Sequence, residues 1–126
     1  MIKERAMELV GALRSGRYQQ TRNRLRTDSG YCCLGVACAI SGLNEWKLTD
    51  RLEWTYLEED NILPERVIEH FGFYNRAGEP RISSGHWSHG DMEIGGKRFH
   101  CLAEANDGGA TFEQIADFIE KNWENL

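Results

Sequence analysis

The spacing of apolar residues predicts a helix at each end of the chain. Near the N-terminus, apolar side chains recur every three or four positions, as one buried helical face requires: Ile2, Ala6, Leu9, Val10 and Leu13. Gly16 is placed to end this helix, because glycine accepts the left-handed cap conformation. Near the C-terminus the same spacing gives Phe112, Ile115, Ala116, Ile119 and Trp123. Thr111 and Gln114 match a capping box, so we expect the last helix to begin directly after Thr111.

The most apolar stretch is GYCCLGVACAI, residues 30–40, and it predicts a helix that is buried on most sides. We expect this helix to cover residues 31–41 and to end at Gly42. A further helix is expected from Pro64, whose fixed φ suits a first helical position, to Gly72. Its apolar side would carry Val67, Ile68 and Phe71.

The segments between these helices predict other structure. Residues 18–26, YQQTRNRLR, have the pattern of an extended segment that projects three arginines from one face: Arg22, Arg24 and Arg26. TDSG, residues 27–30, predicts a turn. The segment 44–61 is ambiguous between a helix and a loop.

Residues 85–102, GHWSHGDMEIGGKRFHCL, predict a β-hairpin. Met92 and Ile94 alternate with polar residues before Gly95-Gly96, a pair that suits a two-residue turn. We expect the return strand to carry Phe99 and Cys101. No repeat or linker interrupts the chain, so residues 1–126 are expected to form one α+β domain. It would hold about four helices and a β-hairpin or small antiparallel sheet.

Composition places the chain among ordinary globular proteins, with 40% apolar and 28% charged residues. No apolar run approaches the ~20 residues that cross a bilayer, and the first residues do not follow the pattern of a secretory signal. We therefore expect a cytoplasmic protein without a membrane partner. In a reducing cytosol its four cysteines are expected to be thiols rather than disulfides.

The net charge of −5 conceals an asymmetry. Residues 1–26 carry seven Lys and Arg against two acids, whereas residues 27–126 carry eight against eighteen. Five arginines follow one another without an acid between them: Arg14, Arg17, Arg22, Arg24 and Arg26. An acidic protein is a poor binder of duplex DNA, but a local basic site for one anion is compatible with this charge. Internal pairing of these arginines, for instance with Glu58, Glu59 and Asp60, is an open alternative.

Five motifs in this order resemble a set of short bacteriophage and prophage proteins, mostly described as hypothetical. They are ALRSGRYQQ (12–20), RLR (24–26), YCCLGVAC (31–38), LPERV (63–67) and LAEANDGGATFEQIADFI (102–119). The resemblance implies a phage-type origin and one domain, and it implies no activity. For a phage-encoded protein the expected compartment is the cytosol of the host cell.

One candidate chemistry is cysteine catalysis. A thiol at a helix N-terminus can have a lowered pKa, and the order Cys, His, Asn/Asp is similar to that of papain-type peptidases. The catalytic set would then be drawn from Cys32, Cys33, His86, His100 and Asp107. The usual Asp-Cys-Ser-Gly sequence of those enzymes is missing. The simpler interpretation is that Cys33 and Cys38 pack in the core as small apolar residues.

Metal and cofactor binding receive little support from the sequence. Zinc sites are normally built from pairs such as Cys-x2-Cys, whereas here the spacings are Cys-Cys, Cys-x4-Cys and His-x2-His. A site built from His86, His89 and His100 is conceivable, but surface histidines explain them more simply. Neither GxxxxGK[ST] nor GxGxxG occurs. We expect no metal and no cofactor.

The leading hypothesis is ligand capture without turnover. Guanidinium groups bind phosphate or carboxylate bidentately, and aromatic faces stack on nucleotide bases. The expected ligand-binding residues are Tyr18, Arg22, Arg24, Arg26, Trp54, His86, Trp87, Asn106 and Asp107. The ligand would be an anionic small molecule, such as a nucleotide-derived signal of host defence that a phage-type accessory protein sequesters.

Two alternatives come from other classes. In the first, the chain is a protein-interaction module whose acidic surface inhibits a host protein. In the second, it is a small cysteine hydrolase of papain type. A homo-oligomer that builds its pocket between two chains is compatible with each hypothesis.

Overall fold

The computed structural model describes residues 1–81 and 92–126, and within these ranges it confirms the α+β class. The helices are α1 (Lys3–Arg14), α2 (Cys33–Ser41), α3 (Glu65–Phe71), α4 (Leu102–Asp107), α5 (Phe112–Asn122) and the short 3-10 turn η1 (Trp123–Asn125). The strands form three antiparallel pairs: β1 (Arg26–Thr27) with β2 (Gly30–Tyr31), β3 (Lys47–Leu48) with β4 (Trp54–Thr55), and β5 (Met92–Ile94) with β6 (Lys97–Phe99). No helix in the described ranges is both long enough and apolar enough to span a bilayer.

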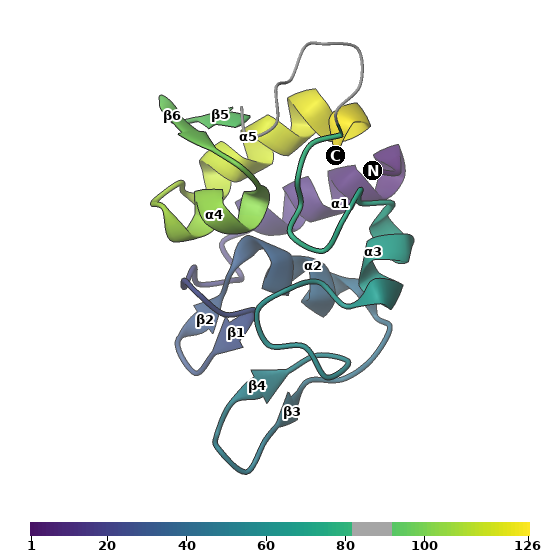
Figure 1. Ribbon diagram of the computed structural model, residues 1–126, viewed down its shortest axis with the longest axis vertical. Helices are drawn as coiled ribbons and strands as arrows, with labels where there is room; N and C mark the ends of the chain where they lie inside the picture. The colour runs from purple at the N-terminus through teal and green to yellow at the C-terminus, as the bar shows by residue number, and fades with distance from the viewer. Residues whose placement is uncertain (82–91) are drawn as a thin grey trace.

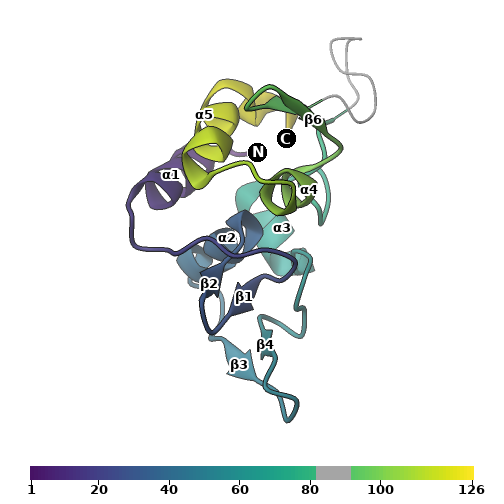
Figure 2. The same ribbon diagram turned by 90° about the vertical axis from the view of Figure 1, so that its left-hand side faces the viewer.

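The helices gather around α2, which is the most buried element. Residues 33–38 of α2 are all buried, because the helix is apolar nearly all round. Helix α1 packs on α2, α5 lies beside α1, and α4 and α3 flank α2 (Figure 1). The β3–β4 hairpin projects away from this helical body at the far end of the molecule (Figures 1 and 2). The core is therefore helical, and the small sheets lie around it.

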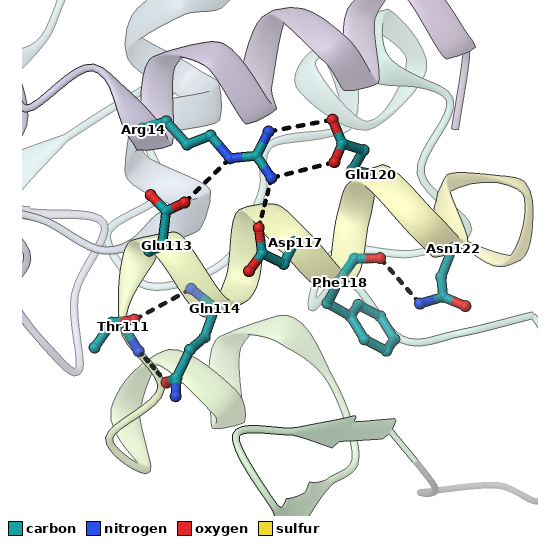
Figure 3. A network of polar contacts seen from close by, with 8 residues as sticks. All are labelled: Arg14, Thr111, Glu113, Gln114, Asp117, Phe118, Glu120 and Asn122. Atoms are coloured by element: carbon teal, nitrogen blue, oxygen red, sulfur yellow. Dashed lines mark hydrogen bonds and ion pairs between the residues drawn. The ribbon is translucent and has the colours of Figure 1, made fainter.

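Arg14 joins α1 to α5 through three carboxylates (Figure 3). Its guanidinium lies 2.5 Å from Asp117, 3.1 Å from Glu120 and 3.5 Å from Glu113. The ion pair with Arg14 lowers the pKa of Glu120 and raises that of Arg14 itself. Because these groups are exposed, the cluster orients the two helices more than it stabilises them. The first of the five consecutive arginines is thus neutralised by the chain's own acids.

The expected helices at both ends and after Pro64 are confirmed, with small corrections. Pro64 is the N-cap residue, and α3 begins at Glu65. The helix expected over residues 31–41 begins at Cys33, with Cys32 as its N-cap. The capping box between Thr111 and Gln114 is present in both directions.

The β5–β6 hairpin is confirmed in its described part, with Gly95 and Gly96 both at positive φ. The return strand was expected to include Cys101, but it ends at Phe99. Cys101 is the N-cap of α4, a helix that the sequence pattern did not predict, and its Sγ accepts a hydrogen bond from the Glu104 N–H. The remainder of the expected hairpin, residues 85–91, lies outside the described residues.

The ambiguous segment 44–61 is neither helix nor plain loop, because it contains the β3–β4 hairpin. The prediction that residues 18–26 form an extended segment is wrong for residues 22–25. Residues 22–25 form bends, and Asn23 has a φ of +71°, which interrupts the alternation of an extended chain. Leu25 is fully buried, so this irregular segment is anchored to the core by its one apolar side chain.

A close backbone contact fixes segment 18–26 against α2. The Cys32 N–H donates to the Leu25 carbonyl at 3.1 Å, and Gly35 lies directly beneath that carbonyl. A Cβ atom on Gly35 would lie 1.7 Å from the Leu25 oxygen, so only glycine fits. The glycine of the YCCLGVAC motif is therefore a requirement of packing.

We expect Gly35→Ala to lower the free energy of unfolding by about 3 kcal/mol, because two backbone segments would have to separate. Urea unfolding of the purified variant measures this. The matched control is Gly11→Ala in α1, where no atom lies within 4 Å of the added methyl group. That variant is expected to gain roughly 0.5–1 kcal/mol from helix propensity. Equal stabilities of the two variants would contradict the close approach.

Candidate functional site

The candidate site is an open hollow of about 410 Å³ between the β1–β2 turn and the tip of the β3–β4 hairpin. We call it the arginine hollow. It is lined by Arg24, Arg26, Thr27, Asp28, Arg51, Leu52, Glu53 and Trp54. The structure thus brings together three of the sequence-predicted ligand-binding residues, Arg24, Arg26 and Trp54.

Arg26 is held by aromatic rings. Its guanidinium carbon lies 3.8 Å from the centroid of the Trp54 ring, 5.3 Å from that of Tyr31 and 5.5 Å from that of Trp46. Its Nε is buried and has no hydrogen-bond partner among the described residues. No described carboxylate forms an ion pair with it. A stacked guanidinium of this kind keeps its charge available while its plane is fixed.

The ring beneath Arg26 is itself fixed. The Trp54 Nε1–H donates to the Asp28 carboxylate at 2.8 Å, which ties the β3–β4 hairpin to the β1–β2 turn. Behind the hollow, edge-to-face contacts link Tyr18, Tyr31, Trp46 and Tyr56 at centroid distances of 5.0 to 5.8 Å. Tyr18, also expected to bind ligand, is therefore part of the support of the site rather than of its lining.

Arg24 is paired within the protein. Its Nη1 lies 3.0 Å from both Glu53 and Asp60, so internal pairing, raised as an alternative from the sequence, applies to this arginine. Exposed ion pairs of this type contribute about 0–1 kcal/mol. An incoming phosphate can therefore compete for Arg24 at small cost.

Arg22 lies apart from the arginine hollow. It is exposed, and its Nη2 would lie 3.7 Å from a Cβ placed on Gly109, in the loop before α5. The prediction that three arginines project from one face is wrong. The left-handed backbone at Asn23 separates Arg22 from Arg24 and Arg26, and only the latter two line the arginine hollow.

Asn106 is the centre of a buried hydrogen-bond network. Its Oδ1 accepts from the Cys33 N–H at 3.1 Å and from Gln20 Nε2 at 2.9 Å, and its Nδ2 donates to the Thr21 carbonyl at 2.8 Å. Gln20 also donates to the Ala110 carbonyl at 2.8 Å. This Asn106 network joins α4, the start of α2, the loop before α5 and segment 18–26. Asn106 is fully buried, so its expected role in ligand contact is not supported by its position.

Asp107 serves the same segment. Its Oδ1 accepts from the Asn23 N–H at 2.8 Å, which stabilises the left-handed turn at that residue. Asn106 and Asp107 therefore shape the path of the chain that leads to Arg26, and they do not line the arginine hollow.

Cys32 and Cys33 do not have the properties of activated nucleophiles. Burial raises the pKa of Cys32 to about 11 and that of Cys33 well above its ordinary value. The hydrogen bond from the Gly35 N–H to Cys32 Sγ, at 3.3 Å, acts in the opposite direction but is the smaller effect. Cys33 Sγ donates to the Leu102 carbonyl at 3.6 Å.

Of the histidines considered for catalysis or metal binding, only His100 lies among the described residues. His100 is exposed, and its backbone N–H donates to Glu104 Oε2 at 2.9 Å. The other expected residues of the 85–91 segment, His86, Trp87 and His89, lie outside the described residues. Among residues 1–81 and 92–126, no three His, Cys, Asp or Glu side chains are grouped closely enough to hold a metal ion.

Five lining residues were missed by the sequence reasoning: Thr27, Asp28, Glu53, Arg51 and Leu52. The last two, Arg51 and Leu52, bear most directly on ligand binding. Both lie at the tip of the β3–β4 hairpin. The available signal was the turn sequence TDR between Leu48 and Trp54, which are cross-strand partners in the structure. It was too short to distinguish a hairpin from a helix of the same composition.

The fold and the site define a small α+β protein with an open, arginine-lined hollow and three buried cysteines whose thiols have a raised pKa, Cys32, Cys33 and Cys38. The chain belongs to the family described as Domain of unknown function (DUF8296), whose model matches residues 1–123. No curated protein and no solved structure matches the chain.

Replacement of Asn106 tests the network. Asn106→Ala leaves the Cys33 N–H and the Thr21 carbonyl buried without this partner, so we expect a loss of about 3–5 kcal/mol in unfolding free energy. The control is Asn122→Ala, which removes one half-buried bond to the Phe118 carbonyl and should cost less than about 1 kcal/mol. Urea unfolding monitored by tryptophan fluorescence separates the two. Similar losses would show that the network is not the anchor of segment 18–26.

Thiol alkylation tests the cysteines. At pH 7.4 a pKa near 11 leaves roughly one Cys32 in 4,000 as thiolate. We expect iodoacetamide to modify Cys101, which is half-buried, before any other cysteine in the native protein. Cys32, Cys33 and Cys38 should react only after denaturation, as mass spectrometry of peptides would report. Rapid modification of Cys32 in the native state would instead favour the hydrolase.

Proposed function

We propose that the protein binds an anionic small molecule in the arginine hollow and holds it without turnover. The observation that carries this proposal is Arg26, a guanidinium stacked at 3.8 Å on Trp54 with no ion pair to any described carboxylate. The guanidinium is already partly desolvated by the aromatic rings, and its Nη groups remain available as hydrogen-bond donors for a ligand.

The charge of the lining supports an anion. The arginine hollow carries three arginines against Asp28 and Glu53. Neither carboxylate forms an ion pair with Arg26, since Asp28 accepts from Trp54 and Glu53 faces Arg24. Two other hollows have more acidic than basic residues, with Glu45, Glu58 and Glu65 in one and Glu65 and Glu79 in the other. The lining thus has an excess of one positive charge, which attracts an anion locally on a chain of net charge −5.

The ligand class follows from the combination of guanidinium and aromatic groups. Arginine forks match phosphate oxygens bidentately, and a Trp–Arg stack offers a flat surface to a base. A nucleotide satisfies both requirements. The buried, protonated thiols supply no nucleophile, which favours retention of the ligand over its chemical conversion.

In its biological role the protein would be a phage-type accessory protein that sequesters a nucleotide-derived signal of host defence. This role draws on the resemblance of the five motifs to phage and prophage proteins and on the lack of an activated nucleophile. A sequestering protein needs affinity rather than catalysis, which a small domain can supply.

A thermal-shift screen with AMP, ADP, ATP, cyclic AMP and cyclic di-AMP tests the proposal. A ligand present at 100 times its Kd stabilises the protein by about 2.7 kcal/mol and raises the Tm. Arg26→Ala and Arg51→Ala should each weaken binding by roughly 10- to 100-fold, because each removes charge-assisted hydrogen bonds. Arg51 lies at an exposed hairpin tip, so its replacement leaves the fold intact.

The matched controls are Arg17→Ala and Arg22→Ala, which remove the same charge outside the arginine hollow. Both should keep the ligand-induced rise in Tm. If the controls lose binding as strongly as Arg26→Ala, attraction depends on overall charge and the proposed site is wrong. If no anion in the screen raises the Tm, the proposed function is wrong.

A further inference from the structure

Leu52, at the tip of the β3–β4 hairpin, has two features that are unfavourable for a leucine. Its backbone is left-handed, with a φ of +61°, and its side chain is 75% exposed. For a bulky L-residue the left-handed region is disfavoured, and glycine or asparagine normally occupies it. The exposed side chain recovers almost none of this free energy through burial.

The hairpin turn needs a left-handed residue here, but it does not need leucine. The Leu52 N–H donates to the Thr49 carbonyl at 2.9 Å, and the Thr49 N–H donates to the Glu53 carbonyl at 2.9 Å. The Glu53 N–H also donates to Thr49 Oγ1 at 3.2 Å. These bonds join main-chain groups and the Thr49 hydroxyl, so they would form with glycine at position 52 and with less strain. The fold therefore gives no reason for the leucine side chain.

The location of Leu52 gives a reason. Its side chain lines the arginine hollow together with Arg26, Arg51 and Trp54. The hollow thus combines three guanidinium groups with an exposed aliphatic group at its outer edge. An inorganic anion would use only the guanidinium groups. A ligand that also carries an apolar ring would use the leucine.

We infer that Leu52 is a specificity-determining residue that contacts the ring of the bound anion and selects nucleotides over inorganic phosphates. This inference rests on the proposed function and adds to it the residue that reads the apolar part of the ligand. Leu52 lines the hollow and is 75% exposed, so its side chain is accessible to a ligand there. Burial of one leucine face against a ring corresponds to about a tenfold gain in affinity.

The test compares wild type and Leu52→Gly by isothermal titration calorimetry with two sets of probes. Adenine and guanine nucleotides (AMP, ADP, GDP and cyclic di-AMP) carry a ring, and inorganic phosphate and pyrophosphate do not. We expect Leu52→Gly to weaken the tightest nucleotide about tenfold and to leave pyrophosphate within twofold of wild type. We also expect its Tm to rise by about 2–3 °C, because glycine relieves the backbone strain.

Two further variants keep the result interpretable. Leu52→Asn retains a residue that tolerates the left-handed backbone but loses the aliphatic group, so it should weaken nucleotides as Leu52→Gly does. Leu48→Ala removes a second exposed leucine of the same hairpin, 47% exposed, that does not line the arginine hollow. It should leave both probe sets unchanged.

The outcomes separate the two proposals. If the nucleotides bind wild type and Leu52→Gly equally, the inference is overturned while the arginine hollow stands. A fall in the Tm of Leu52→Gly would also overturn it, because the leucine would then have a structural role. If neither probe set binds wild type, both this inference and the proposed function fail.

Discussion

The side-chain amide of Asn106 is the interaction on which the candidate site depends. It is fully buried and satisfies the first free N–H of α2, the Thr21 carbonyl and the Gln20 amide at once. Without it, the Cys33 N–H and the Thr21 carbonyl would lose this partner, which costs more than the bonds themselves contribute, and Gln20 Nε2 would keep only its bond to the Ala110 carbonyl. Two distant motifs of the sequence, ALRSGRYQQ and LAEANDGG, meet the YCCLGVAC helix at this one residue.

This network determines the path of an irregular segment that has little structure of its own. Residues 18–26 have one buried apolar anchor, Leu25, whose carbonyl lies against Gly35 and accepts from Cys32. Asp107 stabilises the left-handed Asn23 next to it. Because the segment is fixed at these points, Arg26 enters β1 at a defined place and meets the Trp54 ring. The Asn106 network therefore determines where Arg26 lies in the arginine hollow.

Burial and local packing determine the charge state of Cys32 and the availability of the Arg26 charge. At Cys32 the helix N-terminus favours a thiolate, but desolvation is larger and keeps the thiol protonated. At Arg26 the aromatic faces replace the carboxylates that neutralise Arg14 and Arg24, so neighbouring arginines of one sequence pattern differ in availability. At Leu52 the apolar group is instead 75% exposed, beside three arginines.

The sequence by itself determined the helices at both ends, the α3 segment, the Gly95-Gly96 turn and the burial of α2. These depend on local periodicity and on capping or turn residues, which act over a few positions. It also predicted Arg24, Arg26 and Trp54 as site residues. Only the tertiary structure decided that Arg22 turns away, that Arg24 is paired, that Asn106 is buried and that Arg51 and Leu52 join the site. Each of these depends on contacts between residues far apart in the chain, and no local pattern encodes such contacts.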